Sequence, residues 1–539
     1  MDDKKEIPLK NIIYEKLESN KLIHYEKKSS NKLMDKIILN DTETNCFKVI
    51  KDILIKNKCK TICRVAGGWV RDKLLGIESD DIDIALNDMK GSKLASLINS
   101  ELYPEKEKVG IIKQNEEKGK HLETATIKIN DIWVDFSNLR SEKEEEIGTP
   151  LEDAQRRDLS MNSLFYNINE DKIEDWTKKG INDLKNGVID TPIESEIIFK
   201  DDPLRILRML RFALKYKFRI SDNINNCIEK NIEEYKKNYS NTISGERIEK
   251  ELYKIIKMEN SSFAIAYLHK FNLLENVLQA NKYTINNKKN TFNKIVNIFI
   301  IGQYLYNNKD TYNIFDINMD EDNFDKIDYG LLLLTLCFRN IKEKTDKENN
   351  TINYLILRDT LKTSNNIIKE NQIMNQKFDE LLSIINTDGY NRLTVGNILK
   401  EITYKNIIKL LYGCLSYEYV SIICPESLID SINEDELKPL IEKYKKFFDF
   451  IKNENLLHAD EIKPLFNGKE IMELFNIKPS KEVGLLINYL VETQIEEPNL
   501  KKDEAVNLLT RKRKEFADEK AAYSKSKKDN NKNKKKKKK

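Results

Sequence analysis

The chain has 539 residues, with 92 Lys and Arg against 89 Asp and Glu, so its formal net charge is only +3. This length predicts roughly two to four domains, and the near-neutral balance excludes nucleic-acid binding through bulk charge, so that any such binding requires local basic surfaces. Seven cysteines without paired spacing and four scattered histidines predict neither a zinc site nor a disulfide framework, but the reduced thiols of the cytosol or nucleus.

Residues 1–45 are polar, and we expect an N-terminal extension there with one or two helices. The opening "MDDKKEIPLKNIIYEKL" has neither the apolar core of a signal peptide nor the acid-poor pattern of a transit peptide. No stretch approaches the roughly 18 apolar residues that a membrane span requires. We therefore expect an intracellular, soluble protein of the cytoplasm or nucleus, with import into an organelle left open and the oligomeric state unknown.

From residue 46 to about 200, short β-rich runs such as "DDIDIAL", "ETATIKI" and "IWVDFSNL" alternate with helical patterns and turns. This alternation predicts a mixed α/β domain. After Pro203 strand patterns almost vanish, and apolar residues recur at i, i+3, i+4 and i+7, which predicts a helical array. The final residues 524–539, "SKSKKDNNKNKKKKKK", have low complexity and are expected to be disordered.

The stretch "SDDIDIAL" places two aspartates on an apolar strand. A strand period of two puts Asp81 and Asp83 on one face, with their Cβ atoms roughly 6–7 Å apart, while Ile82 and Ile84 face the core. Two carboxylates at this spacing can share hard cations, and paired Mg²⁺ ions clamp the attacking and leaving oxygens in phosphoryl transfer. Taken alone, such a pair more often marks an amphipathic strand with a solvated acidic face.

Upstream, "VAGGWVRDKLLG" places Gly67 and Gly68 at a strand end immediately before a helix. Glycines let the backbone approach a phosphate, the helix start supplies free N–H groups, and Arg71 can add a charged donor. A Gly-Gly turn by itself is usually only a turn. Because this one precedes an Asp-x-Asp strand by about ten residues, the two features together predict a nucleotidyl-transfer site.

The stretch "RVAGGWVRDKLLGIESDDIDIAL" closely resembles the first motif of the class II tRNA nucleotidyltransferase (CCA-adding) and bacterial-type poly(A) polymerase family, in the polymerase-β-like superfamily. Further segments match the family's successive motifs in order and spacing: "HLETATIKINDIWVDFSNLR", "EDAQRRDLSMNSLFYN", "DDPLRILRMLRFA" and "SGERIEKELYKI". Residues 463–498 resemble the family's C-terminal tail segment. The resemblance covers most of residues 60–260 and part of the tail, whereas residues 270–450 carry little that matches.

The resemblance implies further site residues. Asp135 occupies the position at which relatives carry a carboxylate facing the metal pair, as a third ligand or as a base near the primer hydroxyl; an exposed strand aspartate is the alternative. Of the adjacent Arg156 and Arg157 only one can face a bound nucleotide, because neighbours on a helix point roughly 100° apart. Arg157 is favoured, and the other arginine would brace Asp158 or Glu152.

The segment "DDPLRILRMLRFALKY" predicts a helix that starts at Asp202, with Pro203 in its first turn. Polar residues step around one face of this helix at intervals of three: Asp202, Arg205, Arg208 and Arg211. Apolar residues interleave with the arginines, so this face is expected to line a cleft. An exposed helix with salt bridges is the alternative.

A carboxylate beside a guanidinium can imitate the edge of a base. Asp202 would accept a hydrogen bond from the exocyclic amine of cytosine or adenine, and Arg205 would donate one to the neighbouring ring acceptor. Uracil and guanine carry a carbonyl oxygen in place of that amine and would be rejected. This is the protein-templated selection that the resemblance implies, with Arg208 and Arg211 holding the base, the ribose or neighbouring motifs.

Together these features predict an α+β fold, in which a polymerase-β-like nucleotidyltransferase head with a mixed sheet precedes an all-helical neck, body and tail. The expected domains are a polar extension (1–45), the head (46–200), a nucleotide-selecting neck (201–260), a helical body (261–455), a helical tail in contact with tRNA (456–520) and a disordered Lys-rich tail (521–539).

The expected activity is template-independent addition of CCA to tRNA 3′ ends from CTP and ATP, with Mg²⁺ bound by Asp81 and Asp83 and the tRNA acceptor arm as partner. Three alternatives stay open at this point. They are an enzyme that adds only CC or only A, a poly(A) polymerase, and a catalytically inactive RNA-binding protein on the same fold.

Overall fold

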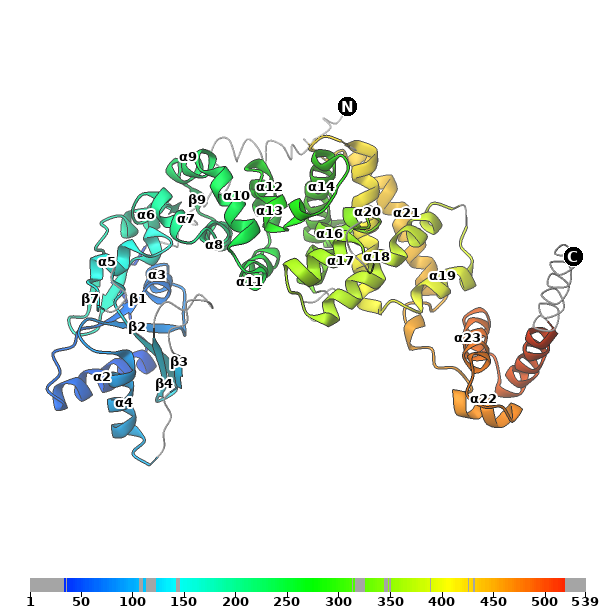
Figure 1. Cartoon of the computed structure of the whole chain (residues 1–539), viewed down its shortest axis with the longest axis horizontal. Helices are drawn as coiled ribbons and strands as arrows, with labels where there is room; N and C mark the ends of the chain where they lie inside the picture. Colours follow the sequence, from blue (N-terminus) through cyan, green and yellow to red (C-terminus); the bar gives the residue numbers. More distant parts are fainter. Residues whose placement is uncertain are drawn as a thin grey trace, which may run out of the picture. The chain divides into compact units, whose positions relative to one another are not determined.

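The computed structural model (Figure 1) describes residues 33–34, 36–105, 110–112, 123–141, 146–312, 314–315, 325–343, 348, 350–387, 389–424, 426–429 and 432–518. The expected Lys-rich tail (521–539) and most of the expected N-terminal extension lie outside these residues. The chain divides into two compact units, the first comprising Met1–Val296, Ile341–Thr363 and Leu428–Ile432, and the second Asn297–Asn340, Ser364–Ser427 and Asn433–Lys539.

A seven-stranded mixed sheet forms the centre of the first unit. Its strands are β1 (Cys63–Ala66), β2 (Ile82–Leu86), β3 (Gly110–Ile112), β4 (Thr124–Ile129), β5 (Ile132–Asn138), β6 (Phe165–Asn167) and β7 (Lys172–Glu174). They are arranged in the order β3-β4-β5-β2-β1-β6-β7, and only β2 and β5 run parallel to each other. The predicted mixed sheet of the head is confirmed.

Two helices, α2 (Asp41–Lys56) and α4 (Gly91–Leu102), pack against one face of this sheet (Figure 1). Strand β4 alternates between buried and half-buried residues, and its apolar side chains Ala125, Ile127 and Ile129 are fully buried. Helix α4 begins against β5 at Gly91, where a Cβ atom would lie 2.2 Å from the Phe136 carbonyl oxygen. The opposite face of β4 and β5 carries mainly polar side chains, with Trp133 as an exposed exception.

Helices account for most of the rest of the first unit. They are α3 (Gly68–Leu74), α5 (Pro150–Gln155), α6 (Gly180–Asn186), α7 (Ser195–Asp201), α8 (Arg205–Tyr216), α9 (Asp222–Lys230), α10 (Ile232–Asn241), α11 (Gly245–Ile256), α12 (Ser261–Lys270), α13 (Leu274–Val277) and α17 (Ile352–Leu355). A two-stranded parallel sheet of β8 (Val188–Ile189) and β9 (Arg219–Ile220) lies among them. Helix α8 packs on α11, and its apolar side chains Ile206, Leu207 and Leu210 are fully buried.

Throughout its described residues the second unit is helical, as the periodicity predicts. Its helices are α15 (Lys309–Tyr312), α16 (Lys326–Thr335), α18 (Asn365–Ile385), α19 (Arg392–Leu399), α20 (Tyr404–Ile423), α21 (Glu434–Asn453), α22 (Gly468–Phe475) and α23 (Lys481–Glu496), while α14 (Lys288–Asn307) crosses from the first unit into the second. A small core, which includes Ile471, Leu486 and Leu509, joins α22, α23 and helical residues 502–518. No described helix has the length and apolar character needed to cross a membrane.

Candidate active site

Three aspartates lie at one end of the sheet. Asp83 on β2 and Asp135 on the parallel strand β5 are direct register partners. Such partners lie about 4.8 Å apart across neighbouring strands and point to the same face, so the two side chains are neighbours. Asp81 immediately precedes Ile82, the first residue of β2, and the strand period places it on the same face as Asp83.

The three carboxylates differ in their protein contacts. The Thr126 hydroxyl, on β4, donates a hydrogen bond of 2.5 Å to Asp135 Oδ1, and Thr126 is the register partner of Asp135. Within the described part of the chain, neither Asp81 nor Asp83 forms a hydrogen bond or ion pair through its carboxylate. Asp135 is therefore oriented by the sheet itself, whereas Asp81 and Asp83 keep their oxygens available for a ligand.

Electrostatics favour a cation beside Asp83. Although its side chain is exposed, the surrounding protein atoms and the negative charge of Asp135 raise the pKa of Asp83 to about 6, against smaller opposing effects that include Arg157. A bound cation would relieve this penalty, so the carboxylates fit a hard divalent ion. Among the residues that the structure describes, however, no three acidic, His or Cys side chains form a complete metal-binding group.

The Gly-Gly turn lies beside the aspartates because β1 pairs with β2. Gly67 follows β1, has φ = +68° and is the N-cap of α3. A Cβ atom at Gly67 would lie 2.7 Å from Arg157 Nη1 and 3.2 Å from the Asn162 carbonyl oxygen. Both the backbone conformation and the lack of space therefore require glycine there. Gly68 is less constrained, since its nearest atom, Arg71 Nη2, would be 3.7 Å away.

The adjacent arginines of "RRD" point to different surroundings, but they follow α5 and do not lie on a helix as expected, since α5 ends at Gln155 and Arg156 is its C-cap. Arg157 lies next to Gly67, donates 3.2 Å to Asp153 Oδ2 and packs over the Phe165 ring. It is also close enough to Asp83 to lower that residue's pKa. Arg156 instead donates to the Ser141 carbonyl oxygen. This placement favours Arg157 over Arg156 as the nucleotide contact, which stays a prediction.

Arg71 is buried, with partners in the head and in the neck. Its Nε donates 2.9 Å to Asp72 Oδ1, and its Nη1 donates to Asn162 Oδ1. Its guanidinium lies over the rings of Phe212 and Tyr216, 5.0 and 4.7 Å from their centroids. A direct contact between Arg71 and a phosphate stays a prediction, and what the structure shows is a link from α3 to α8.

Helix α8 starts at Arg205, so the predicted start at Asp202 is wrong. Asp202 is the C-cap of α7, and a tight turn follows in which Arg205 N–H donates 3.0 Å to the Asp202 carbonyl oxygen. The Asp202 carboxylate accepts a hydrogen bond from the backbone N–H of Leu204 at 3.2 Å. Asp202 thus stabilises the turn that leads into α8 and does not belong to the helix itself.

Asp202 and Arg205 have separate partners in the structure. The other Asp202 oxygen pairs with Arg247 on α11 at 2.6 Å. Arg205 pairs with Asp201 at 2.7 Å and donates 3.1 Å to the carbonyl oxygens of Ile198 and Arg156. The two side chains come from one turn of the chain, but no hydrogen bond joins them, so their joint reading of a base stays a prediction.

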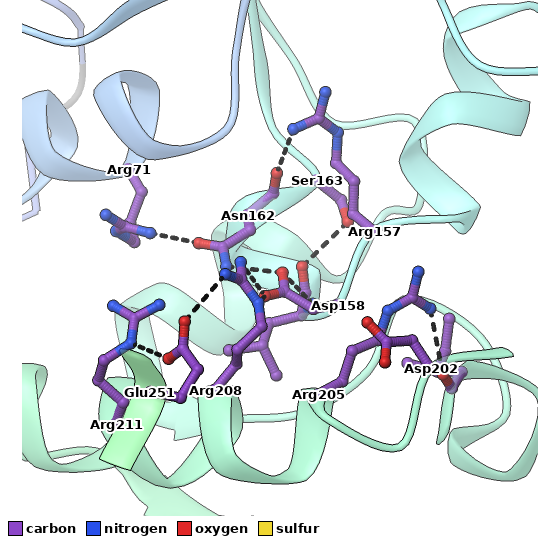
Figure 2. A network of polar contacts seen from close by, with 12 residues as sticks. Arg71, Arg157, Asp158, Asn162, Ser163, Asp202, Arg205, Arg208, Arg211 and Glu251 are labelled. Atoms are coloured by element: carbon purple, nitrogen blue, oxygen red, sulfur yellow. Dashed lines mark hydrogen bonds and ion pairs between the residues drawn. The ribbon is translucent and has the colours of Figure 1, made fainter. Parts of the chain in front are cut away.

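The remaining neck arginines hold two motifs together (Figure 2). Arg208 binds Asp158 through two contacts of 2.8 and 2.7 Å, and Asp158 in turn accepts 2.8 Å from the Asn162 amide. Arg211 donates 2.6 Å to Glu251 on α11 and lies over the Phe212 ring. Of the roles that the sequence left open for Arg208 and Arg211, the structure shows contact with neighbouring motifs.

Asp158 lies at the centre of this network. Burial alone would raise its pKa, but the charge of Arg208 and the hydrogen bond from Asn162 outweigh burial and lower the pKa to about 2. The same pairing raises the pKa of Arg208. Both members of the ion pair are therefore charged at neutral pH.

Sequence reasoning did not assign Asn162, Glu251 or Arg247 to the site. Each lies inside a quoted motif, but its partner is distant in sequence: Asn162 contacts Arg71, Glu251 contacts Arg211, and Arg247 contacts Asp202. The one available signal was an acidic residue among apolar positions of a predicted helix, as with Glu251, which is 6% exposed.

A mixed sheet that presents acidic residues from two parallel neighbours, beside a glycine with positive φ and a helix start, defines the class of nucleotidyltransferase heads. Residues 63–190 match the sequence family described as the poly A polymerase head domain. Enzymes of this class generally use a divalent metal ion.

The similarity to individual proteins extends far beyond the head. A mitochondrial CCA tRNA nucleotidyltransferase of Candida glabrata is 30% identical over 88% of this chain and 96% of its own length. The mitochondrial enzyme of the same name from Saccharomyces cerevisiae is 30% identical over 86% and 91%, and the Schizosaccharomyces pombe tRNA nucleotidyltransferase cca2 is 28% identical over 86% and 97%. The chain belongs to the CCA tRNA nucleotidyltransferase family.

Solved structures support the fold. A CCA-adding enzyme in its apo form superposes with a TM-score of 0.59 at 21% identity, over 88% of this chain and 95% of that one. A Thermotoga maritima CCA-adding enzyme in complex with tRNA superposes with a TM-score of 0.57 at 20% identity, over 88% and 96%. The predicted family and α+β fold class are therefore confirmed.

Proposed function

We propose that this chain adds C, C and A in turn to the 3′ end of tRNA, with CTP and ATP as substrates and without a nucleic-acid template. The similarity over nearly the whole length of named CCA tRNA nucleotidyltransferases supports this activity. The tRNA acceptor arm is the proposed macromolecular partner. In each step the terminal 3′ oxygen bonds to the α-phosphorus of the nucleotide while the bond from that phosphorus to the pyrophosphate leaving group breaks.

The pairing of Asp83 with Asp135 carries the proposal, because two neighbouring carboxylates with a raised pKa at one of them fit a divalent cation. We assign Mg²⁺ to Asp81 and Asp83, with Asp135 as a third ligand or as a base near the primer hydroxyl. When bound, the ion would lower the pKa of the terminal 3′ hydroxyl and stabilise the negative charge on the pyrophosphate leaving group. Thr126 holds the Asp135 carboxylate in position for either role.

The nucleotide would lie on the β1 side of these carboxylates. Gly67 would present its backbone to the triphosphate, and Gly68 leaves space at the start of α3, where the nearest atom to an added Cβ would be 3.7 Å away. Arg157, beside Gly67, can donate to the triphosphate. Asp202 and Arg205 would read the base edge, each after exchanging its present protein partner for the base. The Asp202–Arg247 contact is partly exposed, so this exchange requires little burial of unpaired charge.

The activity is tested by incubation of the full chain with tRNA that lacks its CCA end, with each of the four nucleotides separately and with CTP and ATP together. We expect addition of two C residues with CTP alone and of CCA with both, and none with UTP or GTP. A ladder that stops after CC, addition of a single A only to tRNA that ends in CC, or a long A tract would identify the alternative activities. No addition to any tRNA would contradict the proposal.

The names of two relatives bear on the cellular compartment of this protein. Two of the relatives are named mitochondrial. The sequence pattern favours the cytoplasm or nucleus, and fractionation of cells that carry a tagged full-length chain distinguishes these from an organelle.

A further inference from the structure

One large aromatic side chain lies on the carboxylate face of the sheet and has no place in the site described so far. Trp133 is 59% exposed on β5, two residues before Asp135, so the strand period puts both side chains on the same face. A single exposed apolar residue needs no explanation by itself. Its surroundings decide whether it has a function.

The strand register places Trp133 at the edge of the acidic group. Lys128 on β4 is its direct partner on one side. On the other side, Ile82 of β2 is paired with Val134, and because β2 and β5 are parallel, continuing this register by one residue brings Asp81 beside Trp133. The row Lys128, Trp133 and Asp81 therefore lies one step along the strands from the row Thr126, Asp135 and Asp83.

The turn that joins β4 to β5 sets the position of Trp133 in the sheet. A two-residue turn at Asn130 and Asp131 joins β4 to β5, with Asn130 at φ = +52°, and it fixes the pairing of Ile129 with Ile132. Trp133 follows that pair directly. No aromatic ring or cation in the described part of the chain packs against its indole, and the side chain is 59% exposed, so the ring is accessible to a partner.

The order of the strands separates two sides of the site. Gly67, at the end of β1, and Arg157 lie on the side of β2 that faces away from β5, whereas Trp133 and Lys128 lie on β5 and β4. An in-line displacement puts the attacking oxygen and the leaving pyrophosphate on opposite sides of the α-phosphorus. With the triphosphate on the β1 side, the attacking strand must arrive over β4 and β5.

We propose that Trp133 stacks on the base at the 3′ end of the RNA strand and that Lys128 pairs with a phosphate of that strand. This inference rests on the proposed nucleotidyl transfer. Unpaired bases stack readily on an exposed aromatic ring, whatever the base, which suits an enzyme whose primer end changes with each addition. The Lys128 side chain is 41% exposed, and its present partner Asp131, at 3.6 Å, is 91% exposed, so a phosphate can replace that partner at little cost.

The test compares RNA affinity with nucleotide affinity. Trp133→Ala is expected to weaken binding of tRNA that lacks CCA by roughly five- to a hundredfold, the range for loss of one base–aromatic stack, with the KM for CTP unchanged. Trp133→Phe retains a ring and should recover most of the affinity. Lys128→Ala should cause a smaller loss that fades as salt is raised. Trp176→Ala removes a 43%-exposed tryptophan near the opposite edge of the sheet and should bind RNA as the wild type does.

A tRNA whose last nucleotide lacks its base separates stacking from phosphate contact. The wild type should bind this abasic tRNA more weakly than the intact one, whereas Trp133→Ala should bind both equally. Kd values are measured by fluorescence anisotropy without turnover, so they decide the inference even if no nucleotide is added. An unchanged Kd in Trp133→Ala, or an undiminished preference for the base in that variant, would overturn the inference. Absence of addition by the wild type would contradict the proposed function instead.

Discussion

Asp83 in the head and Asp158 beside the neck are carboxylates of one chain with opposite electrostatics. The pKa of Asp83 is raised to about 6, and its carboxylate has no hydrogen-bonding partner among the described residues. The pKa of Asp158 is lowered to about 2, and its oxygens bind Arg208, Asn162 and the backbone of Leu159. The first environment disfavours the charge that the residue must carry, whereas the second supplies every partner it needs.

The difference separates residues that await a ligand from residues that hold the structure. Acidic groups whose charge is not compensated by the protein fit a cation, and such groups cluster at functional sites. A fully paired carboxylate such as Asp158 instead fixes α8 and the "RRD" segment relative to each other (Figure 2). The predictions below use this contrast.

The largest expected effect is the loss of nucleotide addition when Asp81 or Asp83, whose charge the protein does not compensate, is replaced. Asp83→Asn and Asp81→Ala should each lower nucleotide addition by roughly 10³-fold or more, because a metal ion supplies several kcal/mol of transition-state stabilisation. Their affinity for tRNA should stay close to that of the wild type, because the metal serves the chemical step. Addition is measured on tRNA that lacks CCA, and binding is measured separately. Normal addition by either variant would refute the metal assignment.

A smaller effect, on selectivity, is expected where a partner must be exchanged. Asp202→Ala should lower kcat/KM for CTP and ATP by roughly ten- to a hundredfold, the loss of one good base contact, and should relax rejection of UTP and GTP. Asp201→Ala is the matched control. It removes the acidic partner of Arg205 but leaves the hydrogen bonds from Arg205 to two carbonyl oxygens. The ratios of kcat/KM between the four nucleotides should therefore stay as in the wild type.

The four nucleotides are supplied singly and kcat/KM is compared between them. If Asp202→Ala lowers all four values by one common factor, Asp202 only stabilises the turn before α8, and the templating proposal fails.

Replacement of Asp158, whose charge is compensated by Arg208, should affect stability. Asp158→Asn should lower the free energy of unfolding by about 2 kcal/mol at pH 7, because it leaves the Arg208 guanidinium without its counter-charge. The folded-state pKa of Asp158, about 2, lies below its ordinary value of 3.8, so its contribution to stability is complete above about pH 4 and is lost as the pH falls toward 2. Urea unfolding at pH 7, 5 and 3 should therefore show a difference in the free energy of unfolding between wild type and variant that is smaller at pH 3. A difference that is equal at all three values would contradict the pairing.

The smallest expected effect is a slight stabilisation by Asp83→Asn, in contrast to the destabilisation expected for Asp158→Asn. The raised pKa of Asp83 means that its ionised form is disfavoured in the folded state, a penalty that is absent below about pH 4 and complete above about pH 6. In metal-free buffer Asp83→Asn should therefore raise Tm slightly at pH 8 and leave it unchanged at pH 4. Addition of Mg²⁺ should remove the difference at pH 8, since the ion compensates the wild-type charge. A lower Tm for the variant at pH 8 would show that Asp83 stabilises the fold.

Local pattern was sufficient for some of the site. The strand period placed Asp81 and Asp83 on one face, and the Gly67 turn followed from its position before a helix. The neighbourhood of Asp135 came from the family resemblance alone, because the parallel pairing of β2 with β5 joins segments about fifty residues apart and no local rule predicts such a register.

Long-range partners explain what the sequence did not reveal. The spacing of Asp202 and Arg205 suggested a pair, but Arg247 of α11 and Asp201 of α7 compete for them. Arg71 is three residues after Gly68, which suggested a phosphate contact, and its stacking on Phe212 requires knowledge of how α3 meets α8. Arg247 and Phe212 are distant in the chain from the residues that they contact, whereas Asp201 lies only four residues before Arg205.

Metal binding tests the central contrast most directly. Mn²⁺, a paramagnetic substitute for Mg²⁺, is titrated into the full chain in the presence of CTP and followed by electron paramagnetic resonance. The wild type and Asp158→Asn should bind Mn²⁺ with similar affinity, whereas Asp83→Asn should lose most of the bound ion. Equal binding by Asp83→Asn and the wild type would show that the uncompensated carboxylates do not hold the metal, and the account of the active site would be wrong.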